Sequence, residues 1–434
     1  MDPLFIGLLG FAGMLVLIAL HVPIGIAMAA AGVIGFAALT GNVNAAIAMF
    51  GTETAGAISS PELVIIPMFL LMGSFAGTSG LAGDLYRLAN ALIGHRKGGL
   101  AMATIAGCGG FGAACGSSIA TTATMARIAL PEMESRKYAQ SLGAGSIAAG
   151  GTLGSLIPPS SIMLIYAFLT EQFVVDMFIA GILPGILTIA IYVLAIYVIV
   201  RRDPSLGPAG PRVSWGQAGR VALSTWGIIL VISIMTVGLY GGIFTVTEAA
   251  AAGVLVTMLF AYARGKLNWA NLRSAVAETA HSVGMLYTIL IGAHIFSNFV
   301  TLTQLPSAMV GWIVSLDLAP LMVILVLAVM YIALGAIFDA IAAMVITLPF
   351  VFPLVTEGLG YDPIWWGIVM IVVIEIGMIP PPIGINVFVM HGVRRDIPLS
   401  TIFKGIVPFF GADIVRLLLI ILFPAISIWL PQSM

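Results

Sequence analysis

Glycines and hydroxyl residues cluster in one strongly apolar stretch of this chain. The stretch runs from Gly107 to Thr124 and contains the consecutive serines Ser117 and Ser118. Glycine permits tight turns and close backbone approach, while hydroxyl and carbonyl oxygens are ligands that suit hard cations. One interpretation of the cluster is therefore a Na⁺ site. The alternative is a small-residue face on which two helices pack, and these residues alone favour neither interpretation.

Three more polar side chains stand in apolar surroundings. Asp339 follows Gly335 in a second apolar stretch, Glu375 precedes a run of three prolines, and Asn386 follows that run. An acidic side chain at the centre of a membrane helix costs roughly 2.5–3.5 kcal/mol on insertion scales, so a functional role is the default interpretation. These residues are candidates for binding a substrate or an ion.

The composition places these residues in a membrane. Of 434 residues, 60% are hydrophobic and 8% are charged, whereas soluble domains carry about 25% charged residues. So few charges exclude a soluble enzyme, and the formal net charge of −1 argues against binding nucleic acid. Two cysteines are too few for a disulfide scaffold. The predicted fold class is an all-α polytopic membrane protein.

Ten apolar segments are predicted to cross the bilayer, which takes about 20 residues each. They cover residues 4–20, 24–39, 63–78, 139–170, 178–200, 221–241, 245–263, 279–298, 361–391 and 404–430. Clusters of Lys and Arg mark the cytoplasmic connections, and the other connections carry acidic residues instead. The basic clusters lie near residues 87–97, 136–137, 201–220, 264–273 and 394–404. This orientation places both termini in the periplasm.

Two further apolar stretches, 99–130 and 319–355, each begin and end on one side of the membrane in this arrangement. We therefore expect each to enter the membrane and turn back as a re-entrant helical hairpin. Two ordinary crossings in place of either hairpin would agree equally well with the charges.

The second half of the chain repeats the glycine and proline pattern of the first. Residues 154–159 align with residues 377–382 at an offset of 223, and Tyr138 aligns with Tyr361 at the same offset. Two other pairs of glycine-containing segments align at offsets of 221 and 224. One such match is expected by chance in this composition, but four in order indicate an internal repeat.

The two repeats, about 22–200 and 244–430, enter the membrane from opposite sides. Inverted repeats are typical of secondary transporters, which bind substrate near the midplane at broken helices. The prolines 158–159 and 380–382 remove backbone donors and stop a helix. A simple proline kink is the alternative, but two multi-proline breaks at matched positions favour paired broken helices.

Other charged and aromatic residues have simpler interpretations. Asp413 and Arg416 are three residues apart, and we expect them to pair on one helix face. Arg127 either holds a carboxylate or extends toward the membrane surface. Trp365 and Trp366 are predicted to be interfacial anchors. Three amphipathic segments are expected along the interface: 44–58, 81–95 and 303–316.

The chain resembles the large membrane subunit of tripartite ATP-independent periplasmic (TRAP) transporters. The stretches that carry the likeness are Gly116–Thr121, Gly151–Ser160, Glu375–Asn386 and the segment from Gly335 to Asp339. Together with the length, the likeness covers essentially the whole chain. It implies an elevator-type fold related to sodium–dicarboxylate symporters, in which a transport domain moves against a scaffold.

The resemblance implies the following division of the chain. Residues 1–98 and 171–318 would form scaffold helices with interfacial arms, 99–170 and 319–391 the transport domain, and 392–434 a C-terminal helix. Relatives often have Thr-Pro-Pro at the second break, where this chain has Pro380-Pro381-Pro382. The substitution removes a hydroxyl that could bind an ion there.

Carried over by position, the resemblance assigns Na⁺ and substrate to the two hairpin tips and the two breaks. The expected Na⁺ residues are Gly112, Ser117, Ser118, Thr152, Gly154, Pro158, Gly335, Asp339, Gly377, Pro381 and Gly384. The expected substrate residues are Ser117, Thr121, Ser160, Ser161, Asp339, Glu375 and Asn386.

The resemblance also implies two protein partners. These are a small four-helix membrane subunit, expected to be a separate chain, and a periplasmic protein that delivers the substrate. Membrane lipid surrounds the chain, and neither nucleic acid nor an organic cofactor is expected.

The predicted function is Na⁺-coupled uptake of organic anions across a bacterial inner membrane, with C4-dicarboxylates as the first expectation. Sialic acid and other sugar or keto acids are alternatives within the same class. A channel is disfavoured because inverted broken helices suit alternating access. An intramembrane enzyme is disfavoured because the sequence contains neither a His-Glu-x-x-His nor a Gly-x-Ser-x-Gly pattern.

Overall fold

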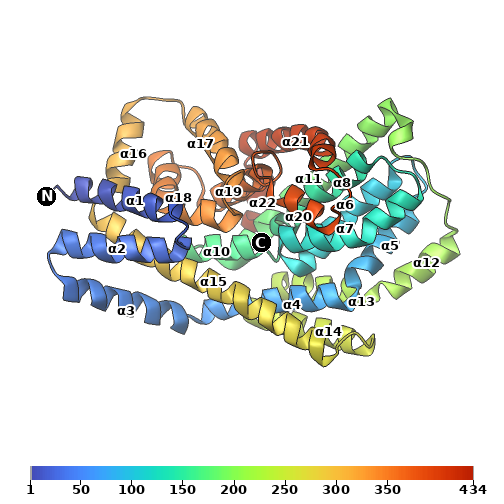
Figure 1. Ribbon diagram of the computed structural model, residues 1–434, viewed down its shortest axis with the longest axis horizontal. Coiled ribbons are helices and arrows are strands. Elements are labelled where there is room, and N and C mark those ends of the chain that lie inside the picture. The colour runs from blue at the N-terminus through green and yellow to red at the C-terminus, as the bar shows by residue number, and fades with distance from the viewer. Residues whose placement is uncertain (1, 434) are drawn as a thin grey trace.

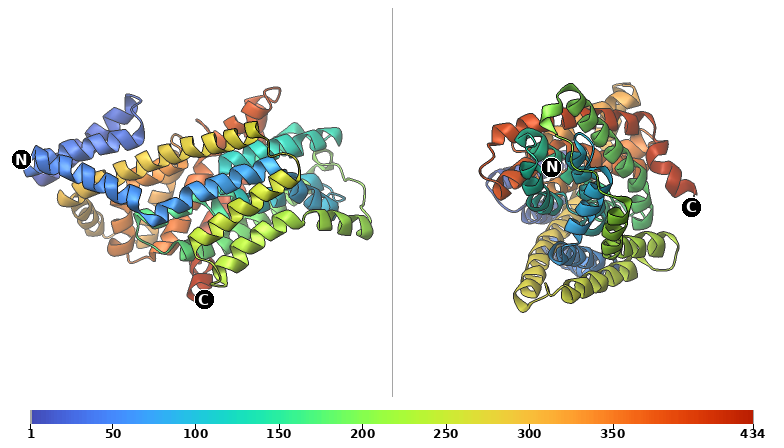
Figure 2. Two further views of the ribbon diagram at one scale, coloured as in Figure 1. Left: turned by 90° about the horizontal axis from the view of Figure 1, so that it is seen from below. Right: turned by 90° about the vertical axis from the view of Figure 1, so that its right-hand side faces the viewer.

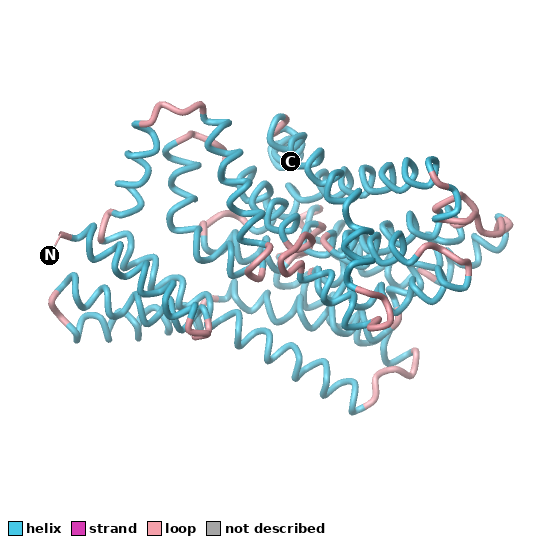
Figure 3. The backbone as a smooth tube through the Cα atoms, turned by 45° about the horizontal axis from the view of Figure 1, so that its top comes forward, coloured by secondary structure: helices cyan, strands magenta, loops and turns pink. Residues whose placement is uncertain are grey.

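The computed structural model describes residues 2–433, and these residues form helices and connecting loops without a strand. The molecule is elongated, with α1, α2 and α3 at one end and α5, α7 and α12 at the other (Figures 1 and 2). Loop segments lie near the middle of the molecule as well as at its ends (Figure 3). The all-helical prediction is confirmed.

The chain begins with five helices that lead to the first hairpin and the first break. They are α1 (Pro3–Ala19), α2 (Ile24–Thr40), α3 (Val43–Ser59), α4 (Ile65–Ser79) after the short η1 (Pro61–Val64), and α5 (Leu81–Ile93). The next helices are α6 (Gly99–Cys115), α7 (Ser118–Ser135), α8 (Gln140–Gly151), α9 (Leu153–Leu156), α10 (Ser161–Leu169) and α11 (Val174–Arg202).

The middle of the chain connects these helices to the second hairpin. It comprises η2 (Pro204–Leu206), α12 (Trp215–Ser224), α13 (Trp226–Ser233), the π-helical η3 (Ile234–Gly238), α14 (Val246–Ala263), α15 (Trp269–Leu302) and α16 (Leu305–Ser315). The last helices are α17 (Pro320–Gly335), α18 (Ala340–Pro353) with the π-helical η4 (Leu354–Gly358), α19 (Pro363–Gly377), α20 (Ile385–Val393), α21 (Leu399–Leu422) and α22 (Ala425–Ser433).

Glycines let two long helix pairs approach closely. A Cβ added to Gly25 of α2 would lie 2.3 Å from the carbonyl oxygen of Thr288 in α15, and one on Gly292 would lie 2.1 Å from the carbonyl oxygen of Gly25. At the second pair, α14 with α4, a Cβ added to Gly253 would instead meet a side chain, the sulfur of Met72, at 2.3 Å. Gly25 and Gly292 give backbone-to-backbone packing of the kind found between membrane helices.

Five helices are long and apolar enough to cross a membrane by themselves: α11, α14, α15, α18 with η4, and α21. The number rises to eight if each of three bent helix pairs is one span. This is fewer than the ten predicted crossings, because α1 and α2 have 17 residues each and α19 has 15. The predicted segment 404–430 also differs from the structure. It is divided into α21 and α22 near Pro424, which lacks the N–H needed to continue a helix.

The connections that carry the basic clusters meet each other. The Gly98 amide donates to the carbonyl of Gly207 at 2.8 Å, and the Ala139 amide donates to the carbonyl of Leu206 at 3.0 Å. Arg394, after α20, donates to both carboxylate oxygens of Glu134 at the end of α7. Its bonds to Asp396 lower the pKa of that exposed carboxyl. One end of the molecule therefore collects these basic loops.

The two adjacent tryptophans are not interfacial anchors, so that prediction was wrong. Trp365 and Trp366 are 1% and 0% exposed on α19, a helix buried on every side from Trp365 to Gly377. The Trp365 ring stacks on Tyr361 with centroids 4.7 Å apart, and its Nε1 donates to the carbonyl of Ile420 at 3.1 Å. Neighbouring helices supply the apolar contacts of both rings and an acceptor for Trp365, whereas the Trp366 Nε1 has no hydrogen-bond partner among the described residues. The segments predicted as interfacial helices do form helices, namely α3, α5 and α16.

Candidate functional site

The tip of the first hairpin lies against the first helix break. Helix α6 ends before Gly116, which adopts a left-handed conformation with φ +66°, and Ser117 caps α7 by accepting from the Ala120 amide at 3.4 Å. The amide and the hydroxyl of Ser161 both donate to the Gly116 carbonyl, at 3.4 and 2.9 Å. Hydrogen bonds from the restarting helix α10 therefore fix the tip of the hairpin.

Glycines bring the backbones of hairpin and break together. A Cβ on Gly112 would lie 2.8 Å from the Cα of Gly154. A Cβ on Gly154 would lie 2.5 Å from the Ser117 carbonyl oxygen and 2.5 Å from Thr121 Oγ1. Ser118 adds an amide hydrogen bond of 3.2 Å to Ser155 Oγ. Any side chain at position 154 would push a carbonyl and a hydroxyl oxygen out of place.

Two hydroxyl oxygens near the first hairpin tip have no hydrogen-bond partner among the described residues. The hydroxyls of Thr121 and Thr122 are buried and unpaired among residues 2–433. Thr152, in contrast, donates to the Ala149 carbonyl at 2.7 Å. Buried hydroxyl oxygens that no protein group satisfies are suited to a small hard cation, and Thr121 Oγ1 lies beside the Ser117 carbonyl oxygen against Gly154.

The second hairpin and the second break repeat this geometry 223 residues later. A Cβ on Gly335 would lie 2.7 Å from the Ile374 carbonyl oxygen and 3.2 Å from the Cα of Gly377. The amide of Ile383 donates to the Ala336 carbonyl at 3.3 Å. The close pair Gly335–Gly377 thus corresponds in sequence position to the pair Gly112–Gly154.

Asp339 is the N-cap of α18, and its carboxylate accepts from the Ile341 amide at 3.2 Å. Its half-buried side chain keeps its second oxygen for another partner. Gly384 precedes α20 with φ +63°. Pro381 is exposed at the second break, whereas Pro158 is half-buried at the first. The prolines of the second break are therefore more exposed to solvent than those of the first.

The two halves meet where the breaks face each other. Asn386 is fully buried, and its amide nitrogen donates to the Ala148 carbonyl at 3.3 Å across the two halves. The hydroxyl of Ser118 lies 4.0 Å from the sulfur of Met378. Glu375 is 1% exposed, and neither carboxylate oxygen has a hydrogen-bond partner in the described part of the chain. The polar residues predicted from the two breaks thus lie in one region.

The serines of the first break serve mainly as helix caps. Ser160 caps α10 by accepting from the Met163 amide at 3.4 Å, and its hydroxyl donates to the Ser155 carbonyl. The Ser160 hydroxyl therefore both donates and accepts within the protein. Ser117 lies on a cavity wall, so it is the predicted hydroxyl residue with direct access to a solute.

A cavity of about 690 Å³ reaches the first hairpin tip. Ser117 and Cys115 line it at the tip, and charged side chains line it elsewhere. The charged residues are Arg87, Arg127, Arg264, Lys266, Asp84 and Glu278. Asp84 forms ion pairs with Arg87 and Arg264, so it is already neutralised. Four basic residues against two acidic ones favour an anion in this space.

A buried network behind the first break was only half predicted. The expected pair forms, with Arg416 Nη2 3.0 Å from Asp413 Oδ1. Tyr192 of α11 donates to both Asp413 oxygens at 2.7 and 2.8 Å and lies 3.5 Å from Thr152 Oγ1. Arg416 also donates to Thr188 Oγ1 at 3.0 Å. The sequence spacing does not indicate that Tyr192 and Thr188 join this network, because more than 220 residues separate them from Asp413 and Arg416.

Replacing Gly154 with alanine is expected to reduce transport at least tenfold, because the new Cβ displaces the Ser117 carbonyl and Thr121. Overpacking of this kind also costs about 1–3 kcal/mol of stability. Transport in proteoliposomes and the thermal midpoint in detergent measure the two effects. The control is Gly284→Ala in α15, where an added Cβ meets nothing within 4 Å. Normal transport by the Gly154 variant would show that this close approach is dispensable.

Apolar helices, two of them broken at prolines, and a positively lined cavity that reaches the first hairpin tip are features of a multi-pass membrane transporter. The family described as "Tripartite ATP-independent periplasmic transporter, DctM component" matches residues 11–426. The chain belongs to this family. It is a TRAP transporter large permease and not an enzyme.

Curated relatives share most of the chain. The C4-dicarboxylate TRAP transporter large permease protein of Pseudomonas aeruginosa is 39% identical over 85% of this chain and 86% of its own. An ectoine TRAP large permease of Halomonas elongata is 30% identical over 96% and 97%. A sialic acid TRAP large permease of Vibrio cholerae is 27% identical over 87% and 88%. Members of the family thus carry names for chemically different substrates.

A solved structure supports the fold. The YdaH transporter of Alcanivorax borkumensis superposes with a TM-score of 0.61 over 88% of each chain, at 12% sequence identity. At this identity the likeness concerns the arrangement of helices alone.

Proposed function

We propose that this permease imports organic anions, C4-dicarboxylates first among them, by coupling their uptake to Na⁺. The observation that carries the proposal is the positively lined cavity that ends at the Ser117 hairpin tip. Arg127 and Lys266 have no ion-pair partner among the described residues, so they are free to attract a carboxylate. The 39% identity to a C4-dicarboxylate permease supports dicarboxylates over larger acids.

The proposed Na⁺ ligands are the oxygens at the two tips and breaks. At the first, Thr121 offers an unpaired hydroxyl beside the Ser117 carbonyl, and Thr122 offers a second one against Gly151. At the second, Asp339 offers a carboxylate oxygen beside the close pair Gly335–Gly377. Bound Na⁺ would offset the charge of the anion, so that the loaded site could cross the membrane without a large desolvation penalty.

The proposed mechanism is alternating access of elevator type in an inverted repeat. The matching contacts at Gly112–Gly154 and Gly335–Gly377 support the repeat and the paired re-entrant hairpins. Helices α11 and α21 share the buried network of Tyr192, Asp413 and Arg416. We therefore expect them to move together with the hairpins, while α2 with α15 and α4 with α14 remain as the scaffold.

The proposed setting is a bacterial inner membrane with both termini in the periplasm. The meeting of the basic loops at one end of the molecule supports this orientation, because basic loops face the cytoplasm. The proposed partners are a small membrane subunit and a periplasmic substrate-binding protein, as the tripartite name of the family implies.

Removing Na⁺ is expected to abolish uptake. The permease, its small membrane subunit and its binding protein loaded with radiolabelled succinate would be assembled on liposomes, with an inward Na⁺ gradient or an equal choline gradient. Succinate should accumulate only with Na⁺, since choline cannot enter a site of protein oxygens. Equal uptake in choline would contradict the coupling. If the liposomes took up sialic acid but not succinate, and still required Na⁺, the proposed substrate would be wrong and the proposed Na⁺ coupling would stand.

A further inference from the structure

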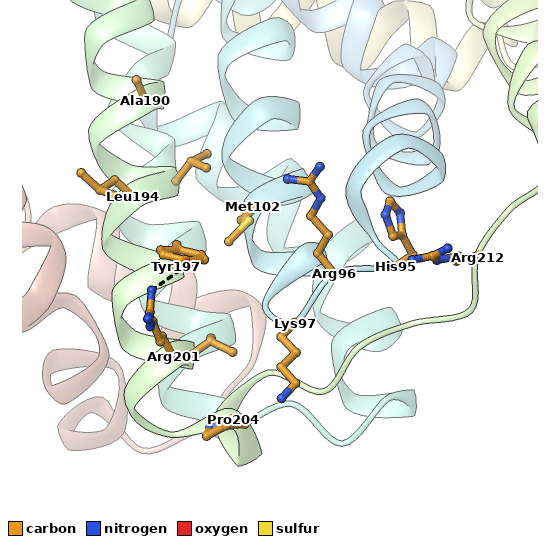
Figure 4. A pocket seen from close by; sticks show the side chains of 12 residues that line it. His95, Arg96, Lys97, Met102, Ala190, Leu194, Tyr197, Arg201, Pro204 and Arg212 are labelled. Atoms are coloured by element: carbon orange, nitrogen blue, oxygen red, sulfur yellow. Dashed lines mark hydrogen bonds between the residues drawn. The ribbon is translucent and has the colours of Figure 1, made fainter.

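A second cleft lies away from the hairpin tips, where α11 ends and α6 begins. It has a volume of about 850 Å³ and is bordered by the loop between α11 and α12, which contributes Pro204 and Arg212 (Figure 4). Its charged lining residues are Arg96, Lys97, Arg201 and Arg212, with His95 beside them. No acidic residue lines it. The cleft is therefore strongly positive and is separate from the proposed transport site.

The basic residues of this cleft are unpaired. None of Arg96, Lys97, Arg201 and Arg212 forms an ion pair with another described residue. Arg201 donates to the Tyr197 hydroxyl at 3.1 Å, and its guanidinium lies 6.0 Å from the centre of that ring (Figure 4). These contacts position Arg201 without neutralising its charge. An anion would supply the missing counter-charge.

The wall that α11 contributes next to these charges is apolar. Ala190, Val193, Leu194 and Tyr197 line the cleft along α11. Leu194 and Tyr197 remain 59% and 50% exposed on a helix that is long and apolar enough to span the membrane. In a bilayer this surface would face acyl chains. The cleft thus joins a cluster of cations to a strip of lipid-facing helix.

Backbone hydrogen bonds hold the cleft in shape. Two backbone hydrogen bonds fix the α11–α12 loop to the α5–α6 connection. The Gly98 amide donates to the Gly207 carbonyl at 2.8 Å, and the Gly210 amide donates to the Gly94 carbonyl at 3.1 Å. Two chain segments about 110 residues apart in sequence therefore supply the basic side chains on a fixed frame. The basic side chains are therefore held on a preorganised backbone before any ligand binds.

We propose that this cleft binds an anionic glycerophospholipid. The phosphate would lie among Arg96, Lys97 and Arg201, and an acyl chain would run along Leu194 and Ala190 of α11. Basic pockets at the ends of membrane helices bind anionic headgroups in this manner. A free phosphate ion would use the cations but would gain nothing from the apolar strip, so the observations favour the lipid.

The test measures phosphatidylglycerol binding to the purified permease by native mass spectrometry, with phosphatidylcholine as the neutral comparison. The cleft variant is Arg96→Gln/Lys97→Gln/Arg201→Gln. Its matched control, Arg220→Gln/Arg273→Gln/Lys404→Gln, removes the same charge from exposed residues outside the cleft. Each lost cation should weaken binding roughly fivefold, so the cleft variant, which lacks three, should lose about a hundredfold in phosphatidylglycerol affinity while the control keeps it.

Two further measurements separate the sources of the effect. Inorganic phosphate at matched ionic strength should fail to displace phosphatidylglycerol, and displacement would show a phosphate site without a lipid. The cleft variant should still co-purify with the small membrane subunit, and loss of that subunit would show a protein interface instead. Equal loss of affinity in both variants, or equal binding of phosphatidylcholine by the wild-type protein, would overturn the proposal.

Discussion

Replacing Asp413 with alanine is expected to lower the free energy of unfolding by about 3–5 kcal/mol, because the change leaves a buried charge without its partner. Arg416 is 1% exposed and forms its ion pair with Asp413 at 3.0 Å, while its hydrogen bond is to the neutral hydroxyl of Thr188. Tyr192 would lose both of its acceptor oxygens as well. Unfolding in mixed detergent micelles, followed by near-ultraviolet circular dichroism, measures the loss.

The double variant Asp413→Ala/Arg416→Met provides the control. Removing both charges should restore most of the stability, since a buried ion pair replaced by apolar side chains is often neutral. Tyr192→Phe should cost about 1–2 kcal/mol, because it removes a single hydroxyl that bonds to a charged group. If the single and double variants were equally unstable, packing rather than charge would explain the effect of position 413.

Replacing Asp339 with asparagine is expected to abolish Na⁺-dependent uptake while the protein keeps its stability. Asparagine caps a helix about as well as aspartate, so the bond to the Ile341 amide survives and only the charge is lost. Alanine at the same position should also lose about 1 kcal/mol, because it removes the cap. Uptake in proteoliposomes and the thermal midpoint in detergent together separate the two roles.

The matched control for this variant is Asp362→Asn. Asp362 caps α19 in the same way, accepting from the Trp365 amide at 2.9 Å, and lies at the opposite end of that helix from Glu375. Near-normal uptake is expected from it. If Asp339→Asn also transported normally, Asp339 would be only a helix cap and would leave the proposed Na⁺ site.

Asp339 and Asp413 differ in how much of their structural role the sequence indicates. Asp339 was expected at a hairpin tip because a charge in an apolar run follows a glycine, yet its role as the cap of α18 was missed. That role was readable, since aspartate directly before a helix is a common N-cap. The Asp413–Arg416 pair was predicted from a spacing of three residues, which places both on one helix face.

Trp365 and Trp366 show where local patterns mislead. A pair of tryptophans beside an acidic loop is typical of a membrane interface, but α19 is enclosed by other helices and buries both. Burial depends on which elements surround a helix. The apolar composition of α19 fits equally well with surrounding lipid and with surrounding protein.

Sequence alone was enough to recognise the membrane class, the two proline breaks and their regular offset. These features depend on composition and on backbone chemistry within a few residues, which proline, glycine and charge control directly. Only the tertiary structure decided that Tyr192 and Thr188 join Asp413 and Arg416, that Gly112 meets Gly154, and that Arg96 and Arg201 share one cleft. Such contacts depend on how separate helices pack, and no short-range rule connects residues that lie 40 to more than 200 positions apart.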